Sequence, residues 1–287
     1  MPNLLRNKVA LVVNAGVPIG QRISSMLSEE GASLVINHHQ YHTSITKDAN
    51  NIADVIVEDI KNHGGNAVSS YENPSTFDSV RNMVSETMKT YGSLDILINC
   101  TPLHTKYEFS EINAEEFDQV VKTHLKGTFN PIKHASAIFR EQKSGRIVNF
   151  TSDAGVDENG GVNNAAVSEA IVGLTRTIAR DLGKYGVTCN AISIPQNLAI
   201  IDTAQPASKK NTRHLNQKFP LNIDNAAALC VLLSTETVPN INGQVFGTKN
   251  DSIHLYSTPS PDRSSHNLGP FSLSDLESVM HYTFGQE

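Results

Sequence analysis

The sequence has few cysteines, and they lie far apart. Only three occur in 287 residues, at Cys100, Cys189 and Cys230. This number and spacing match neither a metal-ligand set nor a framework of disulfide bonds. We therefore expect free thiols, no metal site and a reducing compartment, with the cytoplasm as the expected location.

Long apolar runs and blocks of like charge are also missing. No stretch stays apolar for the roughly 20 residues that a membrane helix needs. The first residues, Met1 to Lys8, lack the pattern of a signal peptide. The formal net charge is −6, and the charges are dispersed along the chain. The sequence therefore predicts no membrane and no nucleic acid as a main partner.

Short apolar runs alternate with helical patterns along most of the chain, and 39% of the residues are hydrophobic. This alternation predicts an α/β fold with a parallel sheet covered by helices on both faces, a three-layer α/β/α arrangement. The expected strands are Val9–Val13, Ser33–Asn37, Ala67–Tyr71, Leu94–Cys100, Arg146–Phe150, Val187–Ile194 and Gln244–Phe246. A polar loop is expected at His38–Asn50, and Asn113 is expected to cap a helix.

We expect one domain over residues 1–250 and a C-terminal extension over residues 251–287. Within the extension, Pro259 and Pro261 lie among polar residues in Thr258–Leu268. Such a composition is typical of an extended surface tail.

Several segments carry a family pattern: His124–Phe129, Gly145–Asn149, Gly186–Ile192 and the glycine-bearing turn Val13–Gly20. With them, the chain resembles the short-chain dehydrogenase/reductase family over about Leu5–Phe246. The resemblance implies a Rossmann-like, doubly wound parallel sheet. It also implies an NAD(P) cofactor whose pyrophosphate would face the first helix.

The first turn departs from the family pattern, which reads Thr-Gly-x-x-x-Gly-x-Gly. Gly20 matches the third glycine, Asn14 replaces the first, and Pro18 replaces the second. Asn tolerates positive φ better than most residues, so we expect Asn14 to keep the turn. Pro18 suits the first helical position, but it adds a ring and removes an N–H group.

Other cofactor-facing positions have changed as well. His38 stands where the resemblance implies an acidic residue against the adenine ribose, Glu72 falls near the adenine, and Asn99 alone matches the Asn-Asn-Ala-Gly motif. Because several such positions have changed together, we predict that NAD(P) binding is weak or absent. The remnant of the cofactor site would consist of Asn14, Gly16, Ile19, Gly20, His38, Glu72 and Asn99.

The catalytic positions are altered too. The family uses a Ser followed by a Tyr-x-x-x-Lys pair on the next helix, where the lysine lowers the pKa of the tyrosine. Ser152 matches the serine, but Ala165 stands at the tyrosine position and Glu169 at the lysine position. His124 falls at the position of the family's catalytic Asn. The resemblance therefore implies the fold without the usual acid–base pair.

Three hypotheses for the function remain open, and we favour the first. In the first hypothesis, the chain is a pseudoenzyme that serves as an oligomer subunit, scaffold or ligand binder. Alternatively it is a non-redox enzyme (isomerase, cyclase or lyase) that uses Ser152 and a hydrogen-bonded pair of His124 and Glu169. The third is an atypical NAD(P)-dependent oxidoreductase for a hydroxyacyl or ketone substrate, with His124 as the substitute acid.

The resemblance also implies partners. His124–Gly127 and Asn242–Phe246 are similar to one branch, the (R)-3-hydroxyacyl-CoA dehydrogenases of multifunctional enzymes. Family members usually pair through the helices after the fourth and fifth strands. We therefore expect a homo-oligomer, dimer or tetramer, or a hetero-oligomer with an active relative, and a small-molecule ligand remains possible.

Overall fold

The computed structural model describes residues 3–39, 52–100, 109–155, 161–195, 221–249 and 251–285. The chain forms two compact units, Met1–Tyr256 and Ser257–Glu287. Most of the loop predicted at His38–Asn50 lies outside the described residues.

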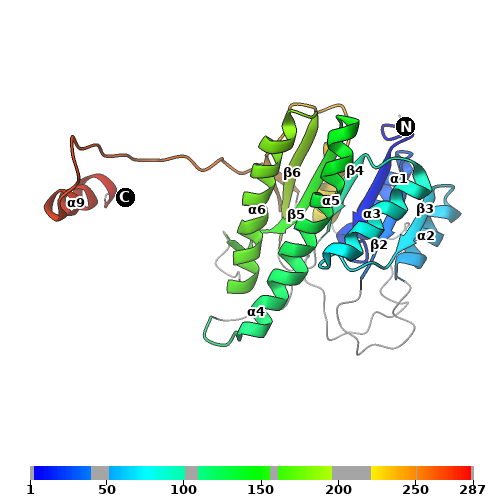
Figure 1. The fold of residues 1–287 in the computed structure, drawn as a ribbon, viewed down its shortest axis with the longest axis horizontal. Helices are drawn as coiled ribbons and strands as arrows, with labels where there is room; N and C mark the ends of the chain where they lie inside the picture. Colours follow the sequence, from blue (N-terminus) through cyan, green and yellow to red (C-terminus); the bar gives the residue numbers. More distant parts are fainter. Residues whose placement is uncertain are drawn as a thin grey trace. The chain divides into compact units, whose positions relative to one another are not determined.

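The first unit contains one eight-stranded sheet with the order β3-β2-β1-β4-β5-β6-β7-β8 (Figure 1). All neighbouring strands run parallel except β7 and β8, which are antiparallel. The strands are β1 Val9–Val13, β2 Ser33–Asn37, β3 Asn66–Ser70, β4 Ile96–Asn99, β5 Gly145–Ser152, β6 Val187–Ile194, β7 Val245–Lys249 and β8 Ser252–Leu255. The predicted doubly wound parallel sheet is confirmed.

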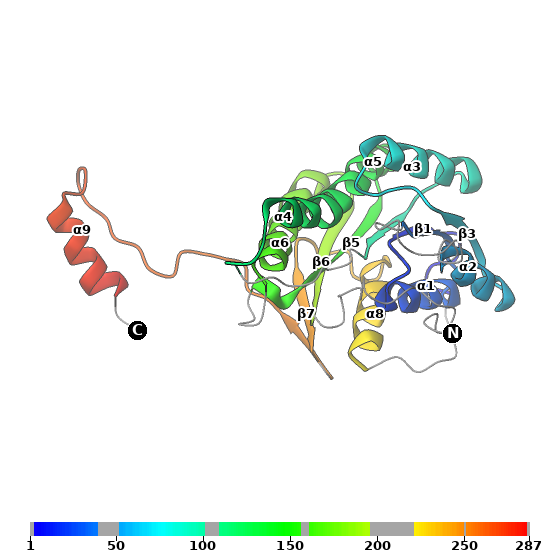
Figure 2. The ribbon, with the colours of Figure 1, turned by 90° about the horizontal axis from the view of Figure 1, so that it is seen from below.

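Helices cover both faces of this sheet (Figure 2). The first face packs against α1 Pro18–Glu29, α2 Ile52–Asn62 and α8 Leu221–Leu233. The second packs against α3 Phe77–Tyr91, α5 Gly127–Gln142 and α6 Val162–Gly183. Within the described ranges, this unit also contains α4 Ala114–Val120, the π-helical turn η2 Val121–Lys126 and the 3-10 turn η3 Asp153–Gly155.

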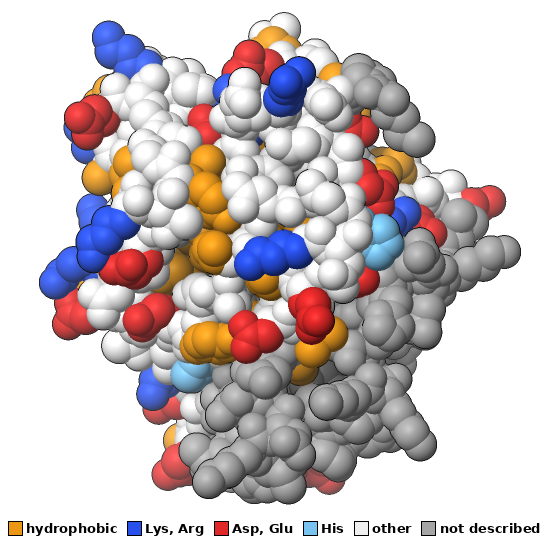
Figure 3. Space-filling model, turned by 90° about the vertical axis from the view of Figure 1, so that its right-hand side faces the viewer, with side chains coloured by type: hydrophobic (Ala, Val, Ile, Leu, Met, Phe, Trp, Pro, Cys, Tyr) orange, Lys and Arg blue, Asp and Glu red, His pale blue; other side chains and the backbone are white. Residues whose placement is uncertain are grey.

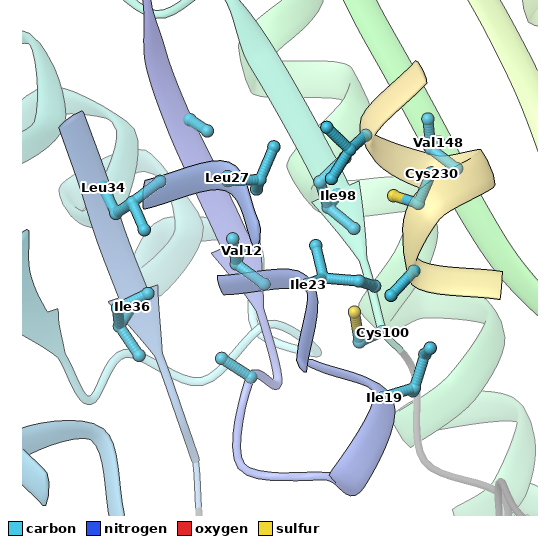
Figure 4. Packing of buried hydrophobic residues seen from close by; sticks show 14 of the residues in the cluster. Val12, Ile19, Ile23, Leu27, Leu34, Ile36, Ile98, Cys100, Val148 and Cys230 are labelled. Carbon is cyan, nitrogen blue, oxygen red and sulfur yellow. The ribbon is translucent and has the colours of Figure 1, made fainter. Parts of the chain in front are cut away.

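Strand β1 is apolar throughout because both of its faces are buried. Ala10 and Val12 belong to the core beneath α1, α2 and α8, whereas Leu11 and Val13 belong to the core beneath α3, α5 and α6. Side chains alternate across a strand, so only a continuous apolar run can fill two cores. Figure 4 shows the first core, in which Val12 lies close to Ile23 and Leu27 of α1.

The three cysteines lie in the two cores. Cys100 and Cys230 are in the first and Cys189 is in the second, and all are free and fully buried. Burial raises the pKa of each thiol, that of Cys189 to about 12. The expectation of free thiols is met.

One strand of the sheet was not expected from the sequence, whereas one helix begins at its expected cap. Strand β8, for which the sequence gives no expectation, pairs with β7 within the first unit. All four of its side chains are exposed, so it lacks the apolar signal of a buried strand. Helix α4 has the predicted cap, with the Asn113 side chain accepting from the Glu116 N–H at 2.9 Å.

The second unit contains a short helix that the sequence reading missed. Helix α9, Leu273–Val279, begins at a capping box formed by Ser272 and Asp275 and continues into the π-helical turn η4, Met280–Phe284. The polar segment Thr258–Leu268 has no helix or strand, as predicted.

Among the helices in the described ranges, none is long and apolar enough to cross a membrane. On the face drawn in Figure 3, acidic and basic side chains are interspersed.

Candidate functional site

The candidate site lies at the carboxyl ends of the central strands. The strand order reverses between β1 and β4, and ligands of open α/β sheets bind outside the strand ends at such a point. The turn from β1 to α1, the end of β2 and the end of β5 all reach this edge. The predicted site residues therefore come from several elements that meet at one edge of the sheet.

Asn14 keeps the first turn in the way the sequence predicts. Its φ is 55°, in the left-handed region that glycine occupies at no steric cost. The Asn14 N–H donates to the Asn37 side-chain oxygen at 3.3 Å, and the Ala15 N–H donates to the Asn37 carbonyl at 2.7 Å. The turn is thus tied to the end of β2.

Gly20 is required by packing. A Cβ atom built there would lie 2.7 Å from the Ala15 Cα and 2.8 Å from the Ala15 carbonyl oxygen. Helix α1 therefore approaches the turn more closely than any side chain permits. Ile19, the neighbouring residue of the predicted set, is buried in the core (Figure 4).

The start of α1 has fewer free donors than the family pattern implies. Pro18 occupies the first turn of the helix, where it has no N–H to offer a phosphate. The buried Gln21 side chain donates to the Gly16 carbonyl at 2.8 Å, a contact that the sequence reading missed. The Gln21 side-chain amide and the Gly16 carbonyl are therefore already paired within the protein.

The imidazole of His38 lies directly over Gly16. A Cβ atom built on Gly16 would be 2.3 Å from Nδ1 and 2.6 Å from Cε1 of that ring. Burial, and secondarily the neighbouring His39, lowers the pKa of His38 to about 4. The ring is therefore neutral at physiological pH.

The polar groups beside His38 serve the fold. The Asn37 side-chain amide donates to the carbonyls of Ser70 at 3.3 Å and Glu72 at 2.9 Å, which ties β2 to the end of β3. The Glu72 carboxylate accepts from the Ser79 hydroxyl. Burial lowers the pKa of His39, while its bond to the Tyr71 carbonyl and the charge of Glu72 oppose the shift.

Asn99 is the first member of a buried chain of polar groups beneath the site. Its amide donates to the Asn149 side-chain oxygen at 2.8 Å, and the Asn149 amide donates to the Thr175 hydroxyl at 3.0 Å. All three residues are fully buried. The chain links β4, β5 and α6 across the second core.

The Ser152 hydroxyl, at the end of β5, bonds to the protein itself. It shares a hydrogen bond of 2.8 Å with the Ser168 hydroxyl and accepts from the Ala154 N–H at 3.2 Å. Within the described part of the chain, no tyrosine or lysine bonds to Ser152. Ser168 was missed by the sequence reading, although it lies three residues after Ala165, on the same face of α6.

Glu169 and His124 lie in different surroundings. The Glu169 side chain is exposed and lies against Gly155, where an added Cβ would be 2.5 Å from its Oε1. His124 is fully buried within the π-helical turn η2, where its carbonyl accepts from the Thr128 hydroxyl at 2.9 Å. Among the described residues, no hydrogen bond joins His124 to Glu169. Their pairing stays a prediction.

Comparison with known proteins identifies the family. The family described as short chain dehydrogenase matches residues 8–213. The 3-oxoacyl-[acyl-carrier-protein] reductase FabG of Staphylococcus epidermidis is 35% identical over 188 residues, which cover 65% of this chain and 74% of that protein. The peroxisomal hydratase-dehydrogenase-epimerase of Neurospora crassa is 31% identical over 200 residues, 69% of this chain and 22% of that protein.

A solved structure agrees with the sequence relatives. A short chain dehydrogenase from Mycobacterium avium superposes with a TM-score of 0.82 at 26% identity, covering 98% of this chain and 96% of that one. The similarity of fold therefore extends along nearly the whole chain. The chain belongs to the short-chain dehydrogenase family.

Proposed function

We propose that this chain is a pseudoenzyme of its family, without redox activity and with weak or no binding of NAD(P). The observation that carries the proposal is the face of α6 that follows Ser152. It carries Ala165 and Glu169, four residues apart, where the family pattern has a tyrosine and a lysine.

The chemistry of these two side chains supports the proposal. A methyl group cannot transfer a proton, and a positioned acid–base group typically contributes about 10²–10⁴-fold to a rate. A carboxylate at residue 169 also reverses the charge that would lower the pKa of a neighbouring phenol. Restoring one residue alone would therefore not restore the pair.

The chain then acts through its fold, as a cytoplasmic oligomer subunit or as a binder of a small molecule. A homo-oligomer, or a hetero-oligomer with an active relative, fits a chain whose fold is retained and whose acid–base pair is lost. Native mass spectrometry of the purified complex tests this part. A monomer under all conditions would contradict the oligomer and leave only the binder of a small molecule.

Calorimetric titration and a turnover assay test the loss of redox function. We expect no binding of NADH or NADPH at micromolar concentrations, and no coenzyme oxidation with a 3-oxoacyl thioester. The double variant Ala165→Tyr/Glu169→Lys tests whether these two positions limit the reaction. The conserved-charge double variant Ala165→Phe/Glu169→Asp is its control. Turnover by the unaltered chain with a saturable coenzyme would overturn the proposal.

A second candidate is an atypical oxidoreductase. The names of the reductase relatives favour it, since they describe 3-oxoacyl-[acyl-carrier-protein] reductases at 35% identity. The buried His124 would have to serve as the acid. A turnover assay of the unaltered chain and of His124→Gln separates the two candidates. Turnover that the unaltered chain shows and a folded His124→Gln lacks would favour the oxidoreductase.

A further inference from the structure

The space above Gly16 is filled by a side chain of the protein itself. A single methyl group on Gly16 would overlap the His38 ring, at 2.3 Å from Nδ1 and 3.0 Å from Cγ. An atom of a ligand needs about as much room as a methyl group, since carbon atoms pack at about 3.5–4.0 Å. The ring and a ligand atom therefore cannot occupy this position together.

This position corresponds to one half of a dinucleotide. In dinucleotide-binding sheets the first turn faces the pyrophosphate, and a residue about 20 positions further along contacts the adenosine ribose. Gly16 belongs to the first turn, and His38 directly follows β2 at the place of the ribose contact. The ring therefore fills the adenosine side of the site.

The backbone holds the ring in place. The His38 N–H donates to the Ser70 carbonyl at 3.0 Å, and the Asn37 carbonyl accepts from the Ala15 N–H at 2.7 Å. The first bond fixes the end of β2 to the end of β3, and the second fixes it against the first turn. His38 thus lies over Gly16 through its position on the fold as well as through its side-chain rotamer.

We propose that His38 closes the adenosine side of the nucleotide site, so that removing its imidazole admits an adenosine nucleotide. The inference rests on the proposed weak binding of NAD(P) and names the side chain responsible for part of it. Nδ1 of the ring is inaccessible to solvent and has no hydrogen-bond partner among the described residues. Removing the ring therefore costs none of these residues a hydrogen bond.

The chain offers a matched control in the next residue. The His39 ring bonds to the Tyr71 carbonyl at 3.3 Å. His39→Ala therefore removes an equal imidazole from the same stretch of backbone. His38→Ser serves as a second opening variant, which keeps a polar side chain if His38→Ala does not fold.

Calorimetric titration with AMP, NADP⁺ and nicotinamide mononucleotide tests the proposal. We expect His38→Ala to bind AMP and NADP⁺ at least about tenfold more tightly than the unaltered chain, a gain of about 1.4 kcal/mol. His39→Ala should bind them as the unaltered chain does. Nicotinamide mononucleotide, which lacks adenosine, should bind equally to all three proteins.

Two outcomes would overturn this inference and leave the proposed function standing. In one, folded His38→Ala and His38→Ser bind AMP no more tightly than the unaltered chain. In the other, His39→Ala gains as much affinity as His38→Ala, which would indicate general loosening of the loop. Micromolar binding of NADP⁺ by the unaltered chain is a different result, and it would remove the proposed weak binding itself.

Discussion

Gly20 provides the sharpest test of the packing around the first turn. In Gly20→Ala the new Cβ would lie 2.7–2.9 Å from the Cα, O and C atoms of Ala15. These are backbone atoms of a turn tied to β2, so they cannot rotate away as a side chain would. Because backbone atoms cannot yield, we expect the upper part of the usual cost of overpacking, about 2–3 kcal/mol, of which alanine recovers about 1 kcal/mol through its helix propensity. We expect a net loss of about 1–2 kcal/mol.

Gly173 is the matched control, because it also lies within a helix, α6, but an added Cβ there would have no described residue within 4 Å apart from its chain neighbours and the backbone of its own helix. Gly173→Ala should therefore stabilise the fold by about 0.5–1 kcal/mol. At about 2–4 °C per kcal/mol for a domain of this size, the two variants should differ in Tm by roughly 3–12 °C. Calorimetry measures the difference, and sedimentation velocity checks that assembly is unchanged. A Gly20→Ala variant as stable as the unaltered chain would refute the close approach.

Two further predictions concern titratable groups. The pKa of His38 is lowered from 6.5 to about 4 in the folded chain, so the unfolded chain takes up a proton first as the pH falls. The part of the free energy of unfolding that comes from the neutral His38 ring is fully present above about pH 6.5 and is lost as the pH falls towards 4. Urea unfolding should therefore show that the unaltered chain loses up to about 2 kcal/mol more than His38→Ala between pH 7 and pH 5. Equal losses would contradict the burial of this ring. The three buried cysteines should resist a thiol reagent in the native protein and react fully in urea. Rapid reaction of even one thiol at pH 7 would contradict their burial.

The fold follows from local pattern to a large extent. The apolar run of β1 and the stripe of Ile19, Ile23 and Leu27 on α1 each report burial directly, because their periods match a strand and a helix. Strand β8 lacked such a signal. Its side chains are exposed and do not pack in a core, and it is a strand only because it pairs with β7.

The site follows from the sequence only in part. The conformation of Asn14 could be predicted because it depends on a single residue's tolerance of positive φ. The bond between Ser152 and Ser168 could not, since it joins a strand end to a helix face through tertiary packing. The same holds for Gln21, whose amide turns back onto the Gly16 carbonyl.

The sequence by itself determined which reactive groups the chain possesses. A methyl at residue 165 and a carboxylate at residue 169 have the same chemistry in any fold. Only the tertiary structure decided what occupies each space: the His38 ring over Gly16 and the Glu169 side chain against Gly155. Functional groups are a property of single residues, whereas occupied volume depends on which distant segments the sheet brings together.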